Sequence, residues 1–146
     1  IVYLSNKSYD SDDNICVHGL DLEKKYYLRR FKKPLDQGYI NKRISIDESK
    51  FNILLAHSPL FVKDYADSHV DLALAGHFHG GTIRLPGGIG VMTPQFHFFN
   101  RLVVGMKKVG NMVQIIGAGL GTHSINIRLN DMSELIVINL KCRNKA

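Results

Sequence analysis

The chain has no tryptophan, two cysteines and four prolines in 146 residues, and it does not begin with methionine. Cys16 and Cys142 lie far apart and lack the short spacing of a metal-binding pair, so we expect buried free thiols in a reducing compartment. No apolar run approaches the ~20 residues of a membrane helix, and the start lacks a signal-peptide pattern. We therefore expect a cytoplasmic protein, or one peripheral to the cytoplasmic membrane, with no transmembrane segment in this chain. The first residue, Ile1, is compatible with a processed or engineered piece.

Hydrophobic residues make up 45% of the chain and charged residues 22%, which is ordinary for a globular protein and argues against disorder. The length fits one domain with a sizeable core. Basic residues outnumber acidic ones by 19 to 13, which leaves a formal net charge of +6. This excess favours anionic partners, namely phosphorylated small molecules, nucleic acid or a membrane surface, without choosing among them.

The hydrophobic pattern predicts a mixed α/β chain that becomes rich in strands towards its C-terminus. Turns or irregular segments are expected at 7–14, 32–50 (or a short helix there), 87–90 and 110–111. Helices are expected at 22–31, with Asp21 as the capping residue, and at 60–65. Strands are expected at 1–4, 15–20, 51–56, 70–75, 82–85, 102–108, 112–116 and 135–140.

The most informative stretch is the apolar strand at 72–75, which is followed by Gly76-His77-Phe78-His79-Gly80-Gly81. Side chains at positions i and i+2 of an extended segment leave the same face, so we expect His77 and His79 to converge. Imidazole is the commonest metal ligand in proteins, and the glycines let the backbone turn sharply. The alternative is a surface loop that happens to contain two histidines.

A third histidine occupies an equivalent position in the pattern. His57 directly follows the apolar strand at 51–56, and Pro59 suits the first turn of the helix at 60–65. Two strands joined by one helical crossover end at the same edge of a sheet, which is where ligands bind. Three imidazoles, those of His57, His77 and His79, therefore predict a metal site.

These segments together resemble the calcineurin-like metallophosphoesterase superfamily. The resemblance is carried by Leu55-Ala56-His57-Ser58-Pro59, by residues 71–81, and by Ile83-Arg84-Leu85-Pro86. Residues 117–121, 127–129 and 134–135 look like the closing segment of one bacterial branch, which contains membrane-associated phosphoesterases and lipid-linked nucleotide-sugar pyrophosphatases. Thr82 departs from that branch, which usually has glutamine at this position.

The resemblance implies the C-terminal half of a four-layer αββα sandwich, with two divalent metal ions of the Mn, Fe, Zn or Mg class at its strand ends. By this carry-over His57 and His77 would bind one metal, and His79 the other. The implied activity is hydrolysis of phosphate monoesters, diesters or pyrophosphates in a phosphorylated small molecule or a lipid-linked substrate. Two metal ions can activate water and neutralise phosphoryl charge.

Three motifs of the resembled family are missing from the chain: an Asp-x-His, a metal-bridging Gly-Asp and a Gly-Asn-His. Asp67-Ser68-His69 spells the first motif but lies between the two ligand segments, where we expect His69 to be exposed. Gly110-Asn111-Met112 lacks the final histidine. The whole chain, 1–146, thus matches the C-terminal half of the family's domain. Because neutral imidazoles supply no carboxylate, we expect at most one bound metal and an inactive piece.

Five further residues are candidates for weaker roles. Arg84 and Arg128 are candidates for contacting a substrate phosphate, and a structural ion pair is the alternative for each. His123 is a candidate for contact with the substrate or with the metal ligands. His97 is expected to pack among its aromatic neighbours or to line a lip that meets an apolar substrate tail. His18 lies inside an apolar strand, so we expect a hydrogen-bonded core or edge histidine.

A rival interpretation is a non-catalytic, basic, metal-stabilised module that binds nucleic acid or a protein partner. It requires a basic face with interleaved aromatic residues, for which 24–33, with Tyr26, Tyr27 and Phe31, is the candidate stretch. The histidine motifs favour the enzyme, so nucleic acid is the less favoured partner. Because half of a two-sheet sandwich leaves an apolar face uncovered, we also expect a homodimer or higher oligomer.

Overall fold

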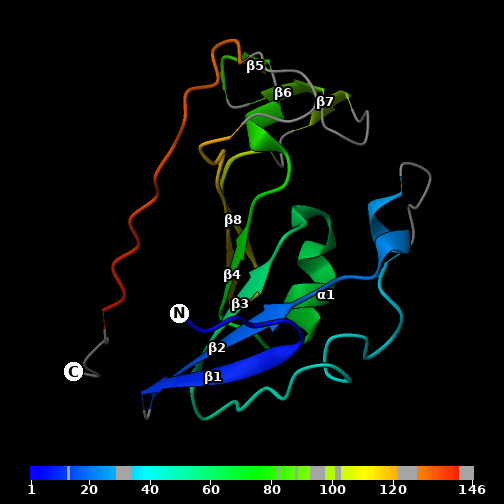
Figure 1. Ribbon diagram of the computed structural model, residues 1–146, viewed down its shortest axis with the longest axis vertical. Helices are drawn as coiled ribbons and strands as arrows, with labels where there is room; N and C mark the ends of the chain where they lie inside the picture. The colour runs from blue at the N-terminus through cyan, green and yellow to red at the C-terminus, as the bar shows by residue number, and fades with distance from the viewer. Residues whose placement is uncertain are drawn as a thin grey trace.

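The computed structural model describes residues 1–12, 14–28, 34–81, 83–87, 89–92, 98–100, 103–121 and 128–141. Its main feature is a six-stranded sheet of order β1-β2-β3-β4-β9-β8, and β5, β6 and β7 form a separate three-stranded sheet (Figure 1). The strands are β1 (Lys7–Asp12), β2 (Ile15–Leu20), β3 (Phe51–Ala56), β4 (Leu72–Ala75), β5 (Arg84–Leu85), β6 (Ile89–Met92), β7 (Phe98–Asn100), β8 (Gly105–Val109) and β9 (Met112–Ile116). The helical segments within these ranges are η1 (Lys24–Tyr27), η2 (Pro59–Phe61), α1 (Val62–Asp67) and η3 (His79–Gly81).

The centre of the large sheet is parallel. Strands β2, β3, β4 and β9 run in the same direction, whereas the edge strands β1 and β8 are antiparallel to their neighbours. The segment containing η2 and α1 connects β3 to β4, which is the kind of crossover that parallel strands require. Because parallel strands end at one edge of a sheet, the residues that follow β2, β3 and β4 emerge side by side.

One face of the large sheet carries the core. The register pairs His18 with Leu54 and Leu54 with Ala73, so these three side chains share a face, and all three are fully buried. Helix α1 packs against this face, and its Tyr65 is also fully buried (Figure 1). Burial of an aliphatic or aromatic side chain stabilises a fold by roughly 1.5–3 kcal/mol, so this face holds the sheet and α1 together.

The opposite face of the large sheet is apolar but only partly covered. The register places Leu55, Leu74 and Ile115 together on this face, and Leu55 is 40% exposed. At the two edges, Tyr9 and Met106 lie on the same side and are 48% and 77% exposed. We name this surface the open face; its residues are Tyr9, Val17, Ile53, Leu55, Leu74, Met106 and Ile115.

The predicted helix after β3 is confirmed, in the form of η2 continued by α1. Ser58 Oγ accepts a hydrogen bond from the backbone N–H of Leu60 at 3.4 Å, and Pro59 occupies the first turn. The Tyr65 hydroxyl donates to the carbonyl oxygen of Ser58 at 2.8 Å, which ties the helix back to the end of β3. The helix therefore fixes the direction in which the chain leaves this strand.

The prediction for the N-terminal region was wrong in two places. Residues 1–4 form no strand, and the polar stretch expected to turn is instead β1, which pairs with β2. Its polar side chains have partners across the sheet: Ser8 Oγ lies 2.7 Å from His18 Nδ1, and Lys50 Nζ donates to Asp10 at 2.9 Å. These long-range contacts stabilise a strand that has no apolar alternation of its own.

The helix expected at 22–31 is reduced to the single turn η1 within residues 21–28. Asp21 does not cap it; its carboxylate accepts a hydrogen bond from Ser5 Oγ at 3.3 Å, and Glu23 precedes the turn without a side-chain cap. The remainder of that prediction, 29–31, falls outside the described residues. An uncapped start gives such a short helix little support.

The C-terminal prediction is confirmed for the β8–β9 hairpin and wrong at two other positions. The glycine-rich loop expected at 87–90 contains the start of β6, because Gly90 allows this strand to pass close to Gly81 and Val103. Residues 135–140 form no strand; they extend along the outside of the molecule (orange to red in Figure 1), and Leu135 is 84% exposed. The apolar run at 135–140 forms a strand only where a partner strand is available.

The fold class is mixed α/β, with a dominant sheet and few helices, which is compatible with an α+β arrangement. Among the described residues, no helix has the length and apolar character needed to cross a membrane.

Candidate functional site

Two of the three predicted histidines lie in contact at the carboxyl edge of the large sheet. His57 follows β3, and His77 follows β4 after Gly76, whose N–H donates to the carbonyl oxygen of His57 at 3.2 Å. Nδ1 of His77 lies 2.8 Å from Nε2 of His57, and the ring centroids are 4.5 Å apart. The parallel strands therefore bring the two imidazoles together, as the sequence pattern predicts.

The third ligand candidate, His79, lies near His57 and makes a separate contact through its Nδ1. Its Nδ1 lies 3.2 Å from the carbonyl oxygen of Gly121. The sequence argument assumed an extended segment, but His77 and His79 have φ angles of 68° and 46°, in the left-handed region. The chain turns at these residues, so the i and i+2 side chains do not share one face. Phe78, between them, is fully buried and anchors the turn.

An aromatic residue that sequence reasoning did not assign to this site packs against the histidine pair. The Tyr27 ring centroid lies 5.9 Å from that of His57 and 5.5 Å from that of His77. Burial, with smaller effects of Asp21 and Tyr39, raises the pKa of Tyr27 to about 12, so its hydroxyl is protonated at neutral pH. The one signal in the sequence is its position after β2, whose end shares the edge with β3 and β4.

The electrostatic environment of His57 favours neutral imidazole. Burial lowers the pKa of His57, and the nearby His79 lowers it further. Neutral imidazole is the form that binds metals. This property makes His57 chemically suitable as a ligand without identifying what it binds.

The residues present do not fit a complete metal centre. The described part of the chain contains no group of three or more histidine, cysteine, aspartate or glutamate side chains arranged to hold a metal ion. Two touching imidazoles are half of the four ligands that zinc commonly takes, and two dications would also need anionic ligands. We therefore describe the His57–His77 pair as a partial ligand set.

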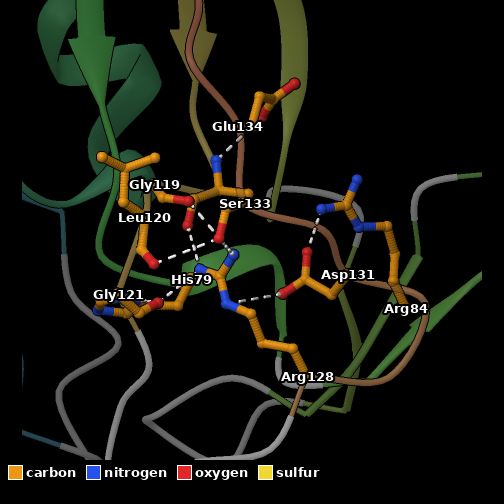
Figure 2. Close-up of polar contacts among 10 residues, drawn as sticks. His79, Arg84, Gly119, Leu120, Gly121, Arg128, Asp131, Ser133 and Glu134 are labelled. Carbon is orange, nitrogen blue, oxygen red and sulfur yellow. Dashed lines mark hydrogen bonds and ion pairs between the residues drawn. The ribbon is translucent and has the colours of Figure 1, made fainter.

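The turn after β4 is braced by the buried carboxylate of Asp131, which Figure 2 shows between Arg84 and Arg128. Asp131 is 2% exposed, pairs with Arg84 and lies 4.0 Å from the guanidinium of Arg128. A Cβ atom at Gly80 would run into the Asp131 carboxylate, so the backbone of the turn lies directly against it. Both arginines that were candidates for substrate contact thus occupy structural ion pairs, which was the alternative interpretation.

Arg128 also holds the loop that follows β9. One of its guanidinium nitrogens, Nη2, donates to the carbonyl oxygens of Ala118 at 2.8 Å and Gly121 at 2.5 Å, and Nη1 donates to Gly119 at 3.2 Å (Figure 2). The same carbonyl oxygen of Gly121 accepts a hydrogen bond from Nδ1 of His79. The loop and the histidine turn are therefore connected through one oxygen atom.

The remaining candidates fall into three groups. His18 is confirmed as a hydrogen-bonded core histidine, with Ser8 at 2.7 Å and Asn52 at 3.0 Å. His69 is exposed and precedes β4, at the edge opposite to the site. His97 and His123 lie outside the described residues, so their predicted roles stay predictions.

The structure bears on the rival nucleic-acid interpretation through two aromatic residues. Tyr26 is 2% exposed within the core, and Tyr27 packs on the histidine pair. Neither ring is therefore free to stack on a base. Residues 29–33, which complete the candidate basic stretch, lie outside the described ranges.

Several bacterial proteins are similar to this chain. It is 32% identical over 99 residues to "Uncharacterized metallophosphoesterase YkuE" of Bacillus subtilis, which covers 68% of this chain and 34% of that protein. It is 33% identical over 142 residues to an "Uncharacterized metallophosphoesterase" of Helicobacter pylori (strain J99), covering 91% of this chain and 36% of that protein. "Uncharacterized protein YpbG" of Bacillus subtilis is 32% identical over 148 residues, covering 96% of this chain and 48% of that protein.

The chain thus spans about a third to a half of the length of these relatives. No protein-family model matches the chain, and no solved structure matches it. Relatives from Campylobacter jejuni and Aquifex aeolicus, 32% and 30% identical, also carry the name metallophosphoesterase. At about this level of identity, the relatives support the metallophosphoesterase superfamily as the family of this chain.

Proposed function

We propose that this chain is the histidine-bearing part of a metal-dependent phosphoesterase. The observation that carries the proposal is the contact between His57 and His77 at the ends of two adjacent parallel strands. The names of the relatives support a hydrolase of this superfamily. The proposed reaction is hydrolysis of phosphate monoesters, diesters or pyrophosphates.

The proposed cofactors are two divalent metal ions of the Mn, Fe, Zn or Mg class. Metal ions of this class supply an activated water and charge neutralisation to phosphoryl transfer. The His57–His77 pair supplies neutral nitrogen ligands, and the negative charge must come from carboxylates of another part of the protein. The chain covers only about a third of its metallophosphoesterase relatives, which leaves room for that part. We therefore propose that this chain alone binds at most one metal ion and is inactive.

The proposed substrates are phosphorylated small molecules or lipid-linked phosphates. The net charge of +6 supports an anionic substrate. The same charge is consistent with the proposed cytoplasmic location, at or near the inner surface of the membrane. We also propose that the large sheet is one layer of a four-layer αββα sandwich, because its open face is apolar and only partly covered.

The ligand role is tested by metal uptake in His57→Ala and His77→Ala. We expect each substitution to abolish most of the bound Zn²⁺ or Mn²⁺ measured by elemental analysis after dialysis. His69→Ala is the matched control because its imidazole is exposed and lies at the opposite edge. Equal metal content in the wild type and the three variants would contradict the proposal that His57 and His77 are metal ligands.

The reaction itself is tested with the complete reading frame that encodes this chain. We expect it to hydrolyse a chromogenic phosphodiester in the presence of Mn²⁺, and we expect His57→Ala to lower the rate at least 100-fold. His69→Ala again serves as the control. No turnover with Mn²⁺, Fe²⁺, Zn²⁺ or Mg²⁺ would contradict the proposed activity.

A further inference from the structure

We propose that Arg128 is a positioning residue that fixes the imidazole of His79 through the carbonyl group of Gly121. In this arrangement Nδ1 of His79 carries the proton and Nε2 keeps its lone pair. The positioning does not rest on the function proposed above; only a role of this Nε2 as a further metal ligand, beside the His57–His77 pair, would rest on that function.

One side chain, that of Arg128, holds the loop after β9. A single guanidinium donates to the carbonyl oxygens of Ala118, Gly119 and Gly121 at 2.8, 3.2 and 2.5 Å. Three carbonyl groups that face one point repel one another electrostatically unless a cation lies between them. Arg128 therefore determines the conformation of this loop, and a lysine ammonium cannot span the same acceptors with a planar fork.

Arg128 is in turn held by the buried carboxylate of Asp131. Its side chain is 13% exposed, and Asp131, with a side chain that is 0% exposed, lies 4.0 Å from its Nε. The backbone of Gly80, one residue after His79, lies against the same carboxylate. Asp131 thus contacts both partners, the guanidinium that holds the loop and the turn that carries the histidine.

A hydrogen bond connects this loop to His79. Nδ1 of His79 lies 3.2 Å from the Gly121 carbonyl oxygen, which can only accept, so the imidazole nitrogen donates. A neutral imidazole that donates from Nδ1 leaves Nε2 unprotonated. Hydrogen bonds from ligand histidines to backbone carbonyl groups commonly select the tautomer in this way.

The tautomer of His79 is measured directly in metal-free protein. We expect two-bond ¹H–¹⁵N correlation spectra of the labelled chain at pH 8.5 to show His79 with a protonated Nδ1 and an unprotonated Nε2. The resonances are assigned by their loss in His79→Gln. A wild-type His79 that is protonated on Nε2 would overturn the proposal without any variant.

The role of Arg128 is measured with Arg128→Lys. We expect the ¹⁵N shifts of the two His79 nitrogens to move towards each other as the tautomers mix. The control is Arg43→Lys, because Arg43 likewise donates to a backbone carbonyl group (Tyr39, 3.1 Å) and to a carboxylate (Glu23, 2.6 Å). An unchanged His79 spectrum in a folded Arg128→Lys protein would show that Arg128 supports the loop alone, and it would overturn the positioning role.

The two proposals fail in different ways. If metal uptake does not depend on His57 and His77, the proposed function is contradicted. The tautomer of His79 can still be measured in the metal-free chain. A wrong tautomer removes the inference about Arg128 while metal uptake by His57 and His77 still tests the function.

Discussion

Among single residues, Gly80 has little freedom to change. It has a φ angle of 72°, and an added Cβ atom would overlap the buried carboxylate of Asp131. Two separate constraints therefore apply to this position, one from the backbone conformation and one from the neighbouring side chain. Gly87 has a similar φ angle of 84° but no atom within 4 Å of an added Cβ. Substitutions at the two glycines therefore separate the cost of the backbone conformation from the cost of overlap with Asp131.

We predict that Gly80→Ala destabilises the chain much more than Gly87→Ala does. The left-handed conformation costs a non-glycine residue roughly 1–2 kcal/mol, which both variants incur. Overlap with Asp131 adds about 1–3 kcal/mol at Gly80 alone, the usual cost of overpacking a buried site. Urea denaturation followed by circular dichroism measures the two free energies of unfolding. Equal losses in the two variants would mean that Asp131 does not pack against Gly80.

The residues of the site differ in how far the sequence reveals them. His57 and His77 could be predicted because each follows an apolar run, and runs of this kind become parallel strands that end at one edge. Tyr27 could not, because its position depends on where β2 lies in the sheet. Arg128 was a candidate for a phosphate contact or an ion pair, but its contacts with the 118–121 loop could not be predicted. Neither could the contact of Asp131 with Gly80, because these contacts join segments that no local pattern connects.

Helix α1 carries a carboxyl group in an environment that disfavours its charge. Burial raises the pKa of Asp64 above its ordinary value of 3.8, although the backbone N–H of Leu35, at 3.0 Å, lowers it in part. A raised pKa in the folded chain means that this group contributes its stability fully below the unfolded pKa. That contribution is lost as the pH rises through the folded pKa.

We predict that Asp64→Asn becomes relatively more stable than the wild type as the pH rises from about 3 to about 7. Asparagine stays neutral over this range and keeps a carbonyl oxygen that can accept from Leu35, so the burial cost of the charge disappears. The measurement is the free energy of unfolding of both proteins at several pH values. A difference that does not change with pH would contradict the raised pKa.

At the level of whole elements, strands with apolar runs were predicted accurately and others were not. The bounds of β2, β3 and β9 agree with the pattern because their side chains are buried on the core face. Strand β1 was missed because it is polar and forms through its pairing with β2. The stretch 135–140 was wrongly assigned because an apolar run predicts a strand without revealing whether a partner strand exists.

For the molecule as a whole, the open face is the unusual feature. It spans the sheet from Tyr9 on β1 to Met106 on β8, and its central residue Leu55 is 40% exposed. Contiguous apolar surfaces of this kind usually belong to interfaces. We propose that, in the isolated chain, a second copy covers this face.

We predict that the isolated chain forms a dimer or higher oligomer and that Leu55→Lys weakens the association at least tenfold. A charged residue at the centre of an apolar interface loses its hydration without gaining a partner. Light scattering after gel filtration measures the mass against the 16.4 kDa of one chain. The control is Leu28→Lys, since Leu28 is 62% exposed, follows η1 and does not belong to the open face. A wild-type chain that remains monomeric at high concentration would contradict the prediction.

Because β2, β3 and β4 are parallel, a change in chain length has different effects inside a strand and in a segment that connects two strands. The segment 34–50 returns the chain to the start of β3 and also buries Leu35, Tyr39, Ile40 and Ile44 in the core, so residues can be added or lost without moving His57 only at its exposed positions. A single residue added within β3 would instead reverse which side chains meet α1 and would carry His57 away from His77. The chemistry at the sheet edge therefore depends on the number of residues inside the strands, whereas exposed loop positions tolerate changes in length.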